Sequence, residues 1–208
     1  MEVLSISTIW RWSPLVKEPS LTTTKPLRAD ARRNREALLA KARELFADGH
    51  FDLRFDDFAR LAGVGTGTLY RHFPTRAALA EAVYREEITA MCARGRELQA
   101  TLPAADALAA LLHYFVDHLH THQGLARTLA TLVAGNADTL ADGGRDLNQV
   151  IADLLAAGVE DGSIRDDVSV GAVMTVVQGI CTACDRPGSR DDADGAVTLV
   201  LDGLRRRA

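Results

Sequence analysis

Residues 55–73 constrain the fold of this chain more than any other segment, because they read as two short helices joined by a glycine turn. The first half spaces its apolar side chains at i, i+3, i+4 and i+7, which is typical of a helix with one buried face. Gly63 follows as a helix stop, because glycine tolerates the left-handed conformation that ends helices. The apolar positions of this half are Phe55, Phe58, Ala59 and Ala62.

The second half, from Val64 to Phe73, has few apolar side chains. Val64 and Leu69 are the expected core anchors, and most of the other side chains carry hydroxyl, phenol, guanidinium or imidazole groups. A short helix with a small core face and a hydrogen-bonding outer face fits the DNA major groove. The alternative interpretation is an ordinary helical hairpin on the surface. Because the outer face suits both bases and phosphates, the pattern favours a DNA-binding helix-turn-helix.

The run Gly63–Phe73 (GVGTGTLYRHF), followed by Thr75–Leu79 (TRAAL), closely resembles the DNA-binding signature of the tetracycline-repressor (TetR) family. Upstream, Arg35–Gly49 resembles the first helix of that family. The match covers roughly Ala29–Tyr84, about a quarter of the chain. The resemblance implies an all-α protein, with a three-helix helix-turn-helix head and a helical body for ligand binding and dimerisation.

Two positions depart from the family pattern. Arg54 stands where the family usually has Ser or Thr, and a guanidinium cannot accept a hydrogen bond from a helix N-terminus. Asp56 and Asp57 partly compensate through the helix dipole. Thr66 stands where the family often has Lys, so one phosphate contact is expected to be missing.

Composition also favours an all-α fold. Hydrophobic residues make up 47% of the 208 residues and aromatic residues only 5%, and Ala and Leu are abundant. Gly49 and Gly162 are expected helix stops, and Thr75 is an expected N-cap. We expect about nine helices, two of them within 55–73 and the others at about Asp30–Asp48, Thr75–Gln99, Pro103–Thr121, Gly124–Ala134, Arg145–Asp161, Ser169–Cys184 and Asp191–Arg206.

The chain is expected to have three parts. Residues 1–27 are interpreted as a poorly ordered N-terminal extension, residues 28–76 as the DNA-binding domain (the head), and residues 77–208 as the ligand-binding and dimerisation domain (the body). The helix after Thr75 is expected to belong to both head and body. No apolar stretch approaches the ~20 residues that cross a bilayer, so no membrane contact is expected.

Charge is divided unevenly between head and body. From Arg28 to Arg76 there are ten Lys or Arg and seven Asp or Glu, whereas from Thr101 to Ala208 there are eight and fifteen. A basic head on an acidic body suits a protein that presents one face to phosphates and repels them elsewhere. The alternative, that these residues simply lie on solvated helix faces, would explain each charge singly. It would not explain why basic residues gather in the head and acidic residues in the body.

The second helix of the pair is expected to contact DNA directly. Thr66, Thr68 and Tyr70 lie on its outer face, where hydroxyl groups can contact bases or phosphates. Gly65 and Gly67 lack a Cβ atom and allow close backbone approach.

Other DNA contacts are expected around this helix. The family resemblance implies phosphate contacts for Tyr70 and His72, whereas Leu69 and Phe73 are expected in the core. Basic side chains complete the surface, at Arg28, Arg32, Arg33 and Arg35 near the first helix, Arg54 before the second and Arg76 in the first turn of the fourth.

The last two helices hold more apolar side chains than a two-domain monomer needs outside its core. The resemblance implies that they pair with their copies as a four-helix bundle in a homodimer; the alternative is burial within one chain. The side chains concerned are Val170, Val173, Met174, Val177, Ile180, Val197, Leu199, Val200, Leu201 and Leu204.

Two clusters suggest other chemistry weakly. Four histidines fall within ten residues from His113 to His122, and His118 and His122 share a helix face, but no third ligand stands at a convincing position. Cys181 and Cys184 lie late in a helix, near its negative end, which argues for inert thiols. We expect no metal and no cofactor, and three cysteines without a disulfide framework fit a reducing cytoplasm.

The sequence therefore predicts a cytoplasmic transcriptional repressor, not an enzyme, that binds a palindromic double-stranded operator as a dimer. A small apolar or amphipathic effector in the body would release it by favouring an arrangement in which the fourth helix tilts. The expected ligand-binding residues are Phe115, His118, Met174 and Gln178. The alternatives are a ligand-independent DNA-binding protein, or a metal- or thiol-dependent enzyme or redox sensor that uses the histidine cluster or Cys181 and Cys184.

Overall fold

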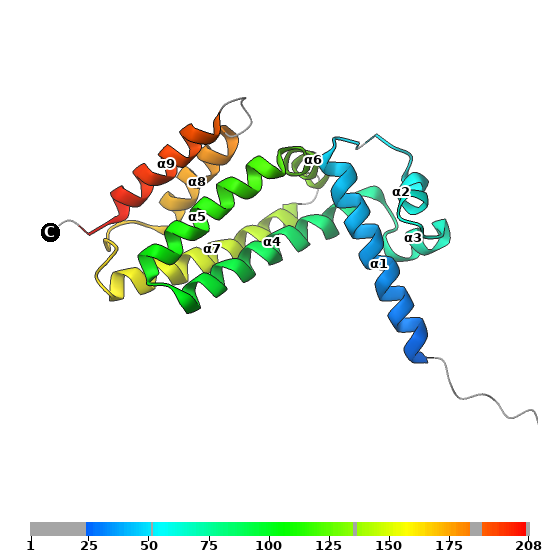
Figure 1. Cartoon of the computed structure of the whole chain (residues 1–208), viewed down its shortest axis with the longest axis horizontal. Helices are drawn as coiled ribbons and strands as arrows, with labels where there is room; N and C mark the ends of the chain where they lie inside the picture. Colours follow the sequence, from blue (N-terminus) through cyan, green and yellow to red (C-terminus); the bar gives the residue numbers. More distant parts are fainter. Residues whose placement is uncertain (1–23, 51, 135–136, 184–188, 207–208) are drawn as a thin grey trace, which may run out of the picture.

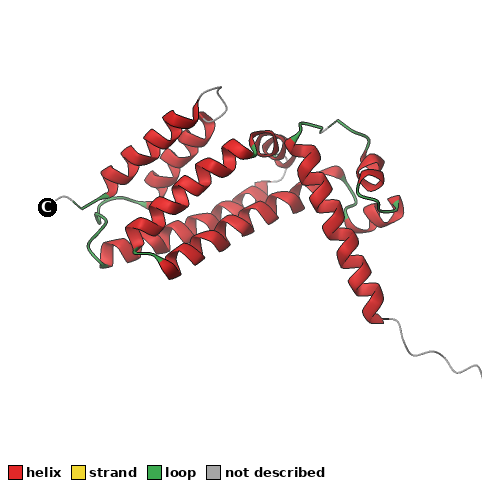
Figure 2. Cartoon of the chain, viewed as in Figure 1, coloured by secondary structure: helices red, strands yellow, loops and turns green. Residues whose placement is uncertain are grey.

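The computed structural model describes residues 24–50, 52–134, 137–183 and 189–206. These ranges contain nine helices, as the sequence predicts (Figure 1, Figure 2). They are α1 (Thr24–Ala47), α2 (Phe55–Leu61), α3 (Thr66–His72), α4 (Arg76–Thr101), α5 (Ala104–Thr121), α6 (Gln123–Val133), α7 (Ala137–Glu160), α8 (Val170–Ala183) and α9 (Ser189–Leu204).

Helices α1, α2 and α3 form the head at one end of the molecule (Figure 1). In the body, α4 and α7 lie side by side, α5 packs on both, and α8 and α9 pack on α5 and on each other. Each part has its own apolar core. Helix α4 belongs to both, as expected, since Leu79 and Val83 lie in the head core and Cys92 and Leu98 in the body core.

Helix α6 packs on the head although it lies in the body half of the sequence. Its buried side chains Leu125, Leu129 and Val133 belong to the head core. The hydroxyl of Thr128 donates a hydrogen bond to the carbonyl of Phe46 at 3.0 Å, near the end of α1. The same carbonyl accepts the N–H of Gly49 at 3.2 Å, so Thr128 adds a second donor at the C-terminus of α1. The body therefore holds the head through α6 as well as through α4.

Two helices begin earlier than the sequence suggests. Helix α1 starts at Thr24 rather than near Asp30, and Pro26 is accommodated because it stands in the first turn, where no intrahelical N–H bond is lost. Residues 24–27, assigned above to the N-terminal extension, are thus helical, and the rest of that extension lies outside the described residues. Helix α7 starts at Ala137 rather than near Arg145.

Glycines allow α4 to pack closely on its neighbours. A Cβ atom at Gly143 of α7 would lie 2.9 Å from the Tyr84 ring, and one at Gly95 of α4 would lie 2.5 Å from Cγ1 of Val150. Both separations are too short for non-bonded carbon atoms. Gly143 therefore serves the packing of α4 on α7 rather than ending a helix. Within the described residues, no helix is both long and apolar enough to cross a membrane.

Candidate nucleic-acid interface

The turn between α2 and α3 is fixed by its backbone. Gly63 has φ of +67°, the left-handed conformation expected of a helix stop. The N–H of Gly63 donates to the carbonyl of Arg60 at 3.2 Å, and the N–H of Val64 donates to the carbonyl of Ala59 at 2.8 Å. These two bonds form a Schellman motif, which ends α2 and redirects the chain into α3.

Buried side chains anchor both helices of the pair. Phe58 and Ala59 of α2 and Leu69 of α3 have no exposed surface, and Phe73 is also buried. Val64 is only half-buried but packs against the same head core. The sequence prediction that Leu69 and Phe73 serve the core is confirmed. Because these side chains fix one side of α3 in the head core, its opposite side faces solvent.

The outer face of α3 carries the polar groups predicted to contact DNA. Thr66, Gly67, Tyr70 and Arg71 are exposed, and Thr68 is half-buried. No side-chain or backbone atom outside its own neighbourhood lies within 4 Å of the position that a Cβ on Gly67 would take. The helix thus offers hydroxyl, phenol and guanidinium groups with room for another molecule to approach closely.

Tyr70 leans on α2 while remaining 49% exposed. Its ring meets the ring of Phe55 edge-on, with centroids 5.4 Å apart. A hydrogen bond with Asp56 raises the pKa of the Tyr70 phenol above its ordinary value, with smaller contributions from burial and from the Asp56 charge. The hydroxyl therefore stays protonated at neutral pH and is a hydrogen-bond donor at the edge of α3.

Around α3, the predicted contacts have different surroundings. Arg54 is exposed and precedes α2 without a side-chain capping bond, as its chemistry predicts. His72 is half-buried and lines a groove of about 570 Å³ with Arg35 and Arg85. The role of each in DNA binding stays a prediction.

Arg76 was predicted to reach a phosphate, which stays a prediction, and the structure shows what it contacts within the head. Its guanidinium donates a hydrogen bond to the carbonyl of Leu53, in the loop before α2, and lies 5.8 Å from the ring centroid of Phe58. This cation–π contact and the hydrogen bond tie the start of α4 to the helix pair. Arg76 thus acts as an internal brace of the head.

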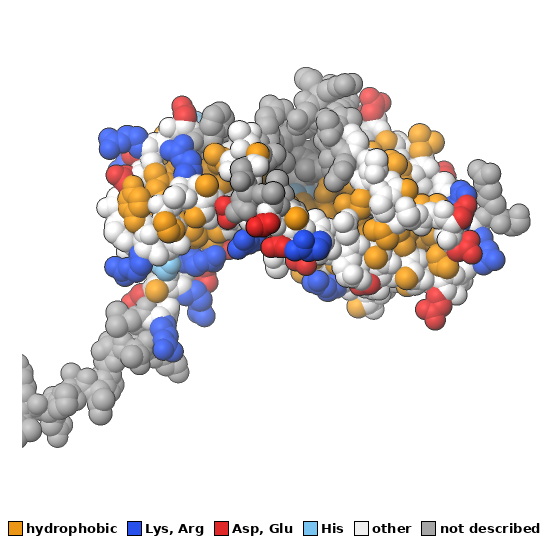
Figure 3. Space-filling model, turned by 180° about the vertical axis from the view of Figure 1, so that it is seen from behind, with side chains coloured by type: hydrophobic (Ala, Val, Ile, Leu, Met, Phe, Trp, Pro, Cys, Tyr) orange, Lys and Arg blue, Asp and Glu red, His pale blue; other side chains and the backbone are white. Residues whose placement is uncertain are grey.

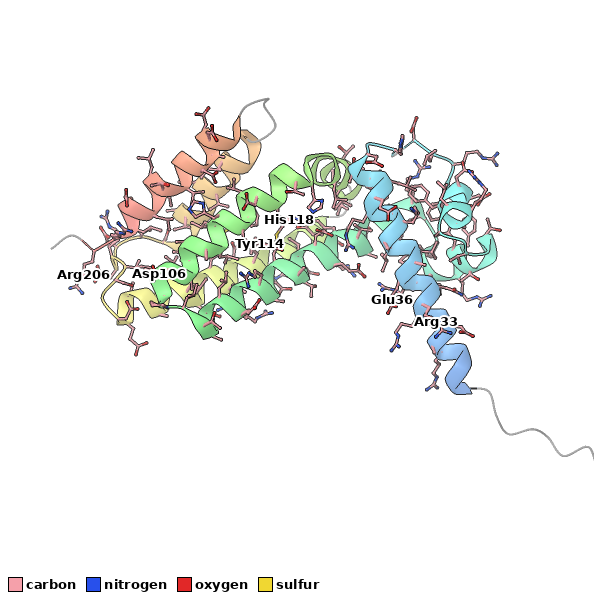
Figure 4. The ribbon with its side chains drawn as sticks, viewed as in Figure 1. Arg33, Glu36, Asp106, Tyr114, His118 and Arg206 are labelled. Carbon is pink, nitrogen blue, oxygen red and sulfur yellow. The ribbon has the colours of Figure 1, made fainter. Side chains whose placement is uncertain are left out.

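Basic side chains gather on the head, at the left of Figure 3. Arg28, Arg32 and Arg33 are exposed on the first turns of α1, which project beyond the rest of the head (Figure 1, Figure 4). Arg33 pairs with Asp30, and Nε of Arg32 lies 3.6 Å from Glu36. Such exposed pairs are worth little in water, so both arginines are available to phosphates.

Two family models match the chain. The model of bacterial regulatory proteins of the tetR family matches residues 38–83, and that of the SbtR-like transcriptional regulator C-terminal domain matches residues 103–206. The chain belongs to the TetR family. It is a DNA-binding transcriptional regulator, with a helix-turn-helix where the sequence motif predicts one.

Relatives of known structure or function agree with this family membership. A TetR transcriptional regulator from Streptomyces coelicolor is 38% identical, with a TM-score of 0.68 over 84% of this chain and 99% of that one. The HTH-type transcriptional repressor KstR2 of Rhodococcus jostii is 27% identical over 184 residues, which are 82% of this chain and 90% of that protein. Reduced NemR of E. coli shares the fold at 18% identity, with a TM-score of 0.71 over 84% of this chain and all of that one.

The body residues predicted to bind an effector fall into two places. Phe115 on α5 and Met174 on α8 are half-buried and pack against the same core, on helices that contact each other. His118 points elsewhere, since its Nε2 atom lies 2.9 Å from Oε2 of Glu87 on α4. The Gln178 side chain lies outside the described residues. A shared site for these four residues stays a prediction of the TetR-type interpretation.

The weaker clusters acquire partners in the structure or lie outside it. His113 pairs with Asp194 of α9 at 3.5 Å. Within the described part of the chain, no group of three or more His, Cys, Asp or Glu side chains is arranged to hold a metal ion. The side chains of His120, Cys181 and Cys184 lie outside it. Cys92 has a free, buried thiol, and burial raises its pKa.

An ion-pair cluster on Glu87 was missed by sequence reasoning. Nε of Arg43 on α1 donates to Oε1 of Glu87 at 2.5 Å, and Nε2 of His118 on α5 lies 2.9 Å from Oε2, the other oxygen of the same carboxylate. The three side chains come from three helices, so no local spacing in the sequence relates them. His118 lies near the end of α5 that approaches the head (Figure 4).

Helices α8 and α9 use much of their apolar surface within the chain. Val173, Val177, Ile180, Val197 and Leu204 are buried in the body core. The prediction that the whole set forms a dimer surface was therefore too broad, and intramolecular burial explains these five. Leu199 of that set is 75% exposed, and Val176 of α8, which was not in the set, is 45% exposed.

Proposed function

We propose that this TetR-family chain is a repressor that binds a palindromic operator as a homodimer through residues 66–72. In this proposal a small apolar or amphipathic effector, held in the body, releases the protein from DNA. The observation that carries the proposal is α3 itself. Leu69 anchors it in the head core, while Thr66, Gly67 and Tyr70 face water. The name of the Rhodococcus relative, a transcriptional repressor, supports repression over activation.

Selection of bound duplexes from a random pool tests the DNA-binding part of the proposal. We expect a palindromic consensus whose half-sites lie about one helical turn apart, or about 34–36 Å, because a symmetric dimer places two recognition helices on one face of DNA. Affinity for the consensus should fall steeply with salt, because Lys and Arg displace counterions from phosphates. A single, asymmetric half-site as the consensus would contradict the dimer, and no enrichment would contradict operator binding.

The dimer surface that we propose lies on the outer sides of α8 and α9. It includes small or apolar exposed residues at Ala172, Thr175, Val176, Gly179, Gly195, Thr198, Leu199 and Gly203, and the exposed Asp202 beside them pairs with Arg205 at 3.2 Å. A Cβ atom at Gly179, Gly195 or Gly203 would meet nothing within 4 Å, so the surface is open to a second copy. Large exposed apolar side chains among small ones are typical of helix-packing interfaces.

Leu199→Glu should convert the dimer to a monomer. A two-fold interface buries each residue twice, so the substitution places two carboxylates against apolar surface. We expect light scattering to report the mass of one chain, and operator affinity to fall on the order of 100-fold or more, since the second recognition helix is no longer tethered. Leu102→Glu, at the exposed end of α4, is the matched control and should leave the dimer intact. An unchanged mass for Leu199→Glu would place the interface elsewhere.

Effector release is proposed to act through the two helices that join body and head. Helix α4 passes through both cores, and α6 supplies Leu125, Leu129 and Val133 to the head core. An effector near Phe115 and Met174 that favours a shifted α5 would move α6 and α4 together. It can change operator affinity only as far as it binds that shifted arrangement better.

A further inference from the structure

The joint between α5 and α6 is a single residue, His122. Helix α5 ends at Thr121 and α6 starts at Gln123. The N–H of His122 donates to the carbonyl of His118 at 2.9 Å, which closes the last turn of α5. Helix α6 then carries Leu125 and the Thr128 hydroxyl into the head. The conformation at His122 therefore decides how α6 leaves the body and lies on α1.

The surroundings of this joint are rich in charge. The imidazole rings of His118 and His122 lie with their centroids 4.7 Å apart. His118 contacts Glu87 at 2.9 Å, and Arg43 holds the same carboxylate at 2.5 Å. The His118 and Glu87 side chains are only 15% and 12% exposed, so water screens these charges weakly. The Glu87 carboxylate thus contacts both the Arg43 guanidinium and the His118 imidazole. The His122 imidazole lies beside that of His118.

Other groups around the pair are on α1, α4 and α5. Glu86 of α4 accepts a hydrogen bond from Arg43 at 3.2 Å and faces Arg35 at 3.6 Å, so its charge is largely directed to arginines. The ring of Tyr114 lies 6.0 Å from that of His118, and Asp117 on α5 is exposed. Glu87 bonds to His118 and Arg43, and Glu86 bonds to Arg43, so within the described residues neither of these two carboxylates is bonded to His122.

The electrostatics of the joint disfavour a proton on His122. Burial lowers the pKa of His122 below its ordinary 6.5, the His118 charge lowers it further, Glu87 acts against this, and Arg43 adds to the lowering. Burial also opposes ionisation of Glu87, but its bonds to His118 and Arg43 outweigh that effect and lower its pKa. Glu87 therefore stays charged, and acid acts on His122 instead.

We propose that the His118–His122 pair makes the attachment of α6 to the DNA-binding head sensitive to acid. As the pH falls through the ordinary range of histidine, an arrangement with His122 in water takes up a proton more readily than the closed joint does. Because the open arrangement then binds more protons, falling pH shifts the equilibrium toward it. Helix α6 loosens from α1, and the head loses part of its support.

The consequence for DNA binding rests on the function proposed above. A loosened head must be ordered again when two recognition helices dock at a fixed spacing, which costs binding free energy. Acid therefore weakens operator binding, in addition to any direct effect of His72 at the DNA.

Hydrogen exchange tests the joint without DNA. We expect protection factors for the backbone amides of α6 and of residues 42–47, corrected for the intrinsic effect of pH, to fall roughly threefold to tenfold between pH 7.5 and 5.5. In His122→Gln, which cannot titrate, the fall should be largely abolished. His113→Gln, on the same helix but paired with Asp194, is the matched control and should respond as the native protein does.

Either of two results would overturn the inference. One is that the native protein keeps its protection in α6 at pH 5.5, and the other is that His122→Gln loses it as the native protein does. Far-UV circular dichroism at pH 7.5 verifies that the variant is folded, and the response of the native protein alone remains decisive if it is not. A parallel titration of a selected duplex separates the two proposals, because failure to bind any duplex at either pH contradicts operator binding and leaves the exchange result standing.

Discussion

Tyr70→Ala should strongly weaken specific operator binding while the fold stays intact. The side chain is half-exposed on the outer face of α3, so its removal leaves no cavity in the head core. Its ring packs edge-on against Phe55, which fixes the position of the phenol before DNA arrives, and its single O–H proton has to turn from Asp56 to a phosphate on binding. A pre-ordered donor to a phosphate oxygen loses little conformational entropy on binding. We expect the affinity for the selected operator to fall on the order of 10- to 100-fold, measured by fluorescence anisotropy.

A second substitution at Tyr70 separates the roles of ring and hydroxyl. Tyr70→Phe keeps the contact with Phe55 and removes only the donor, so it should lose most of the same affinity. The slope of log affinity against log salt should remain unchanged in both variants, because a neutral phenol releases no counterion. Unchanged affinity in a folded Tyr70→Ala protein would show that α3 presents another face to DNA.

The helix-turn-helix was predictable because its signals are local. The apolar spacing of α2 places Phe58 and Ala59 in the core, and Gly63 takes the left-handed conformation that its position requires. Thr75 caps α4 by accepting a hydrogen bond from the N–H of Ala78 at 3.1 Å, again as predicted. Each of these features depends on neighbours within four residues, which a single sequence displays directly.

What the sequence could not reveal depends on partners far along the chain. Helical spacing predicts that Leu125 and Leu129 are buried, but not that they enter the head core. The sequence predicted a helix start near Arg145, whereas α7 starts at Ala137 and its Gly143 is needed for the approach of Tyr84. The sequence also did not show that Arg76 contacts the Leu53 carbonyl and the Phe58 ring, whereas its phosphate contact stays a prediction. A charged or small residue can have several roles in a protein. Which role it has depends on tertiary contacts, which the sequence alone does not show.

The same limit applies to the dimer surface. The apolar pattern of the last two helices does not distinguish core positions from interface positions, because both must exclude water. In the structure, Val197 and Leu204 face the body core, whereas Leu199 faces away from it. Of the ten predicted side chains, Leu199 is the one that the proposed surface keeps as exposed, and the structure adds the exposed Val176, which was not among them.

Phe58→Ala should unfold the head, and this is the largest stability effect we expect. The Phe58 side chain has no exposed surface and lies at the centre of the head core, with the Phe46 ring at 5.5 Å and the Phe55 ring at 6.1 Å. Truncating a buried phenylalanine costs about 3–5 kcal/mol, a large part of the 5–15 kcal/mol that stabilises a typical domain. The Arg76 guanidinium also loses the ring beneath it. Urea unfolding followed by circular dichroism measures the loss.

Leu61→Ala provides the matched control, since Leu61 lies on the same helix and is 41% exposed. It should cost less than about 1 kcal/mol. Measurements of operator binding then distinguish a residue that stabilises the head from a residue that contacts DNA. Phe58→Ala weakens binding because fewer molecules have a folded head, so added stabilising osmolyte should restore much of its affinity. Tyr70→Ala should not recover under the same conditions, because its head is already folded. If Phe58→Ala instead unfolded at the same urea concentration as the native protein, the head core would not depend on this ring, and α3 would have to be held by other contacts.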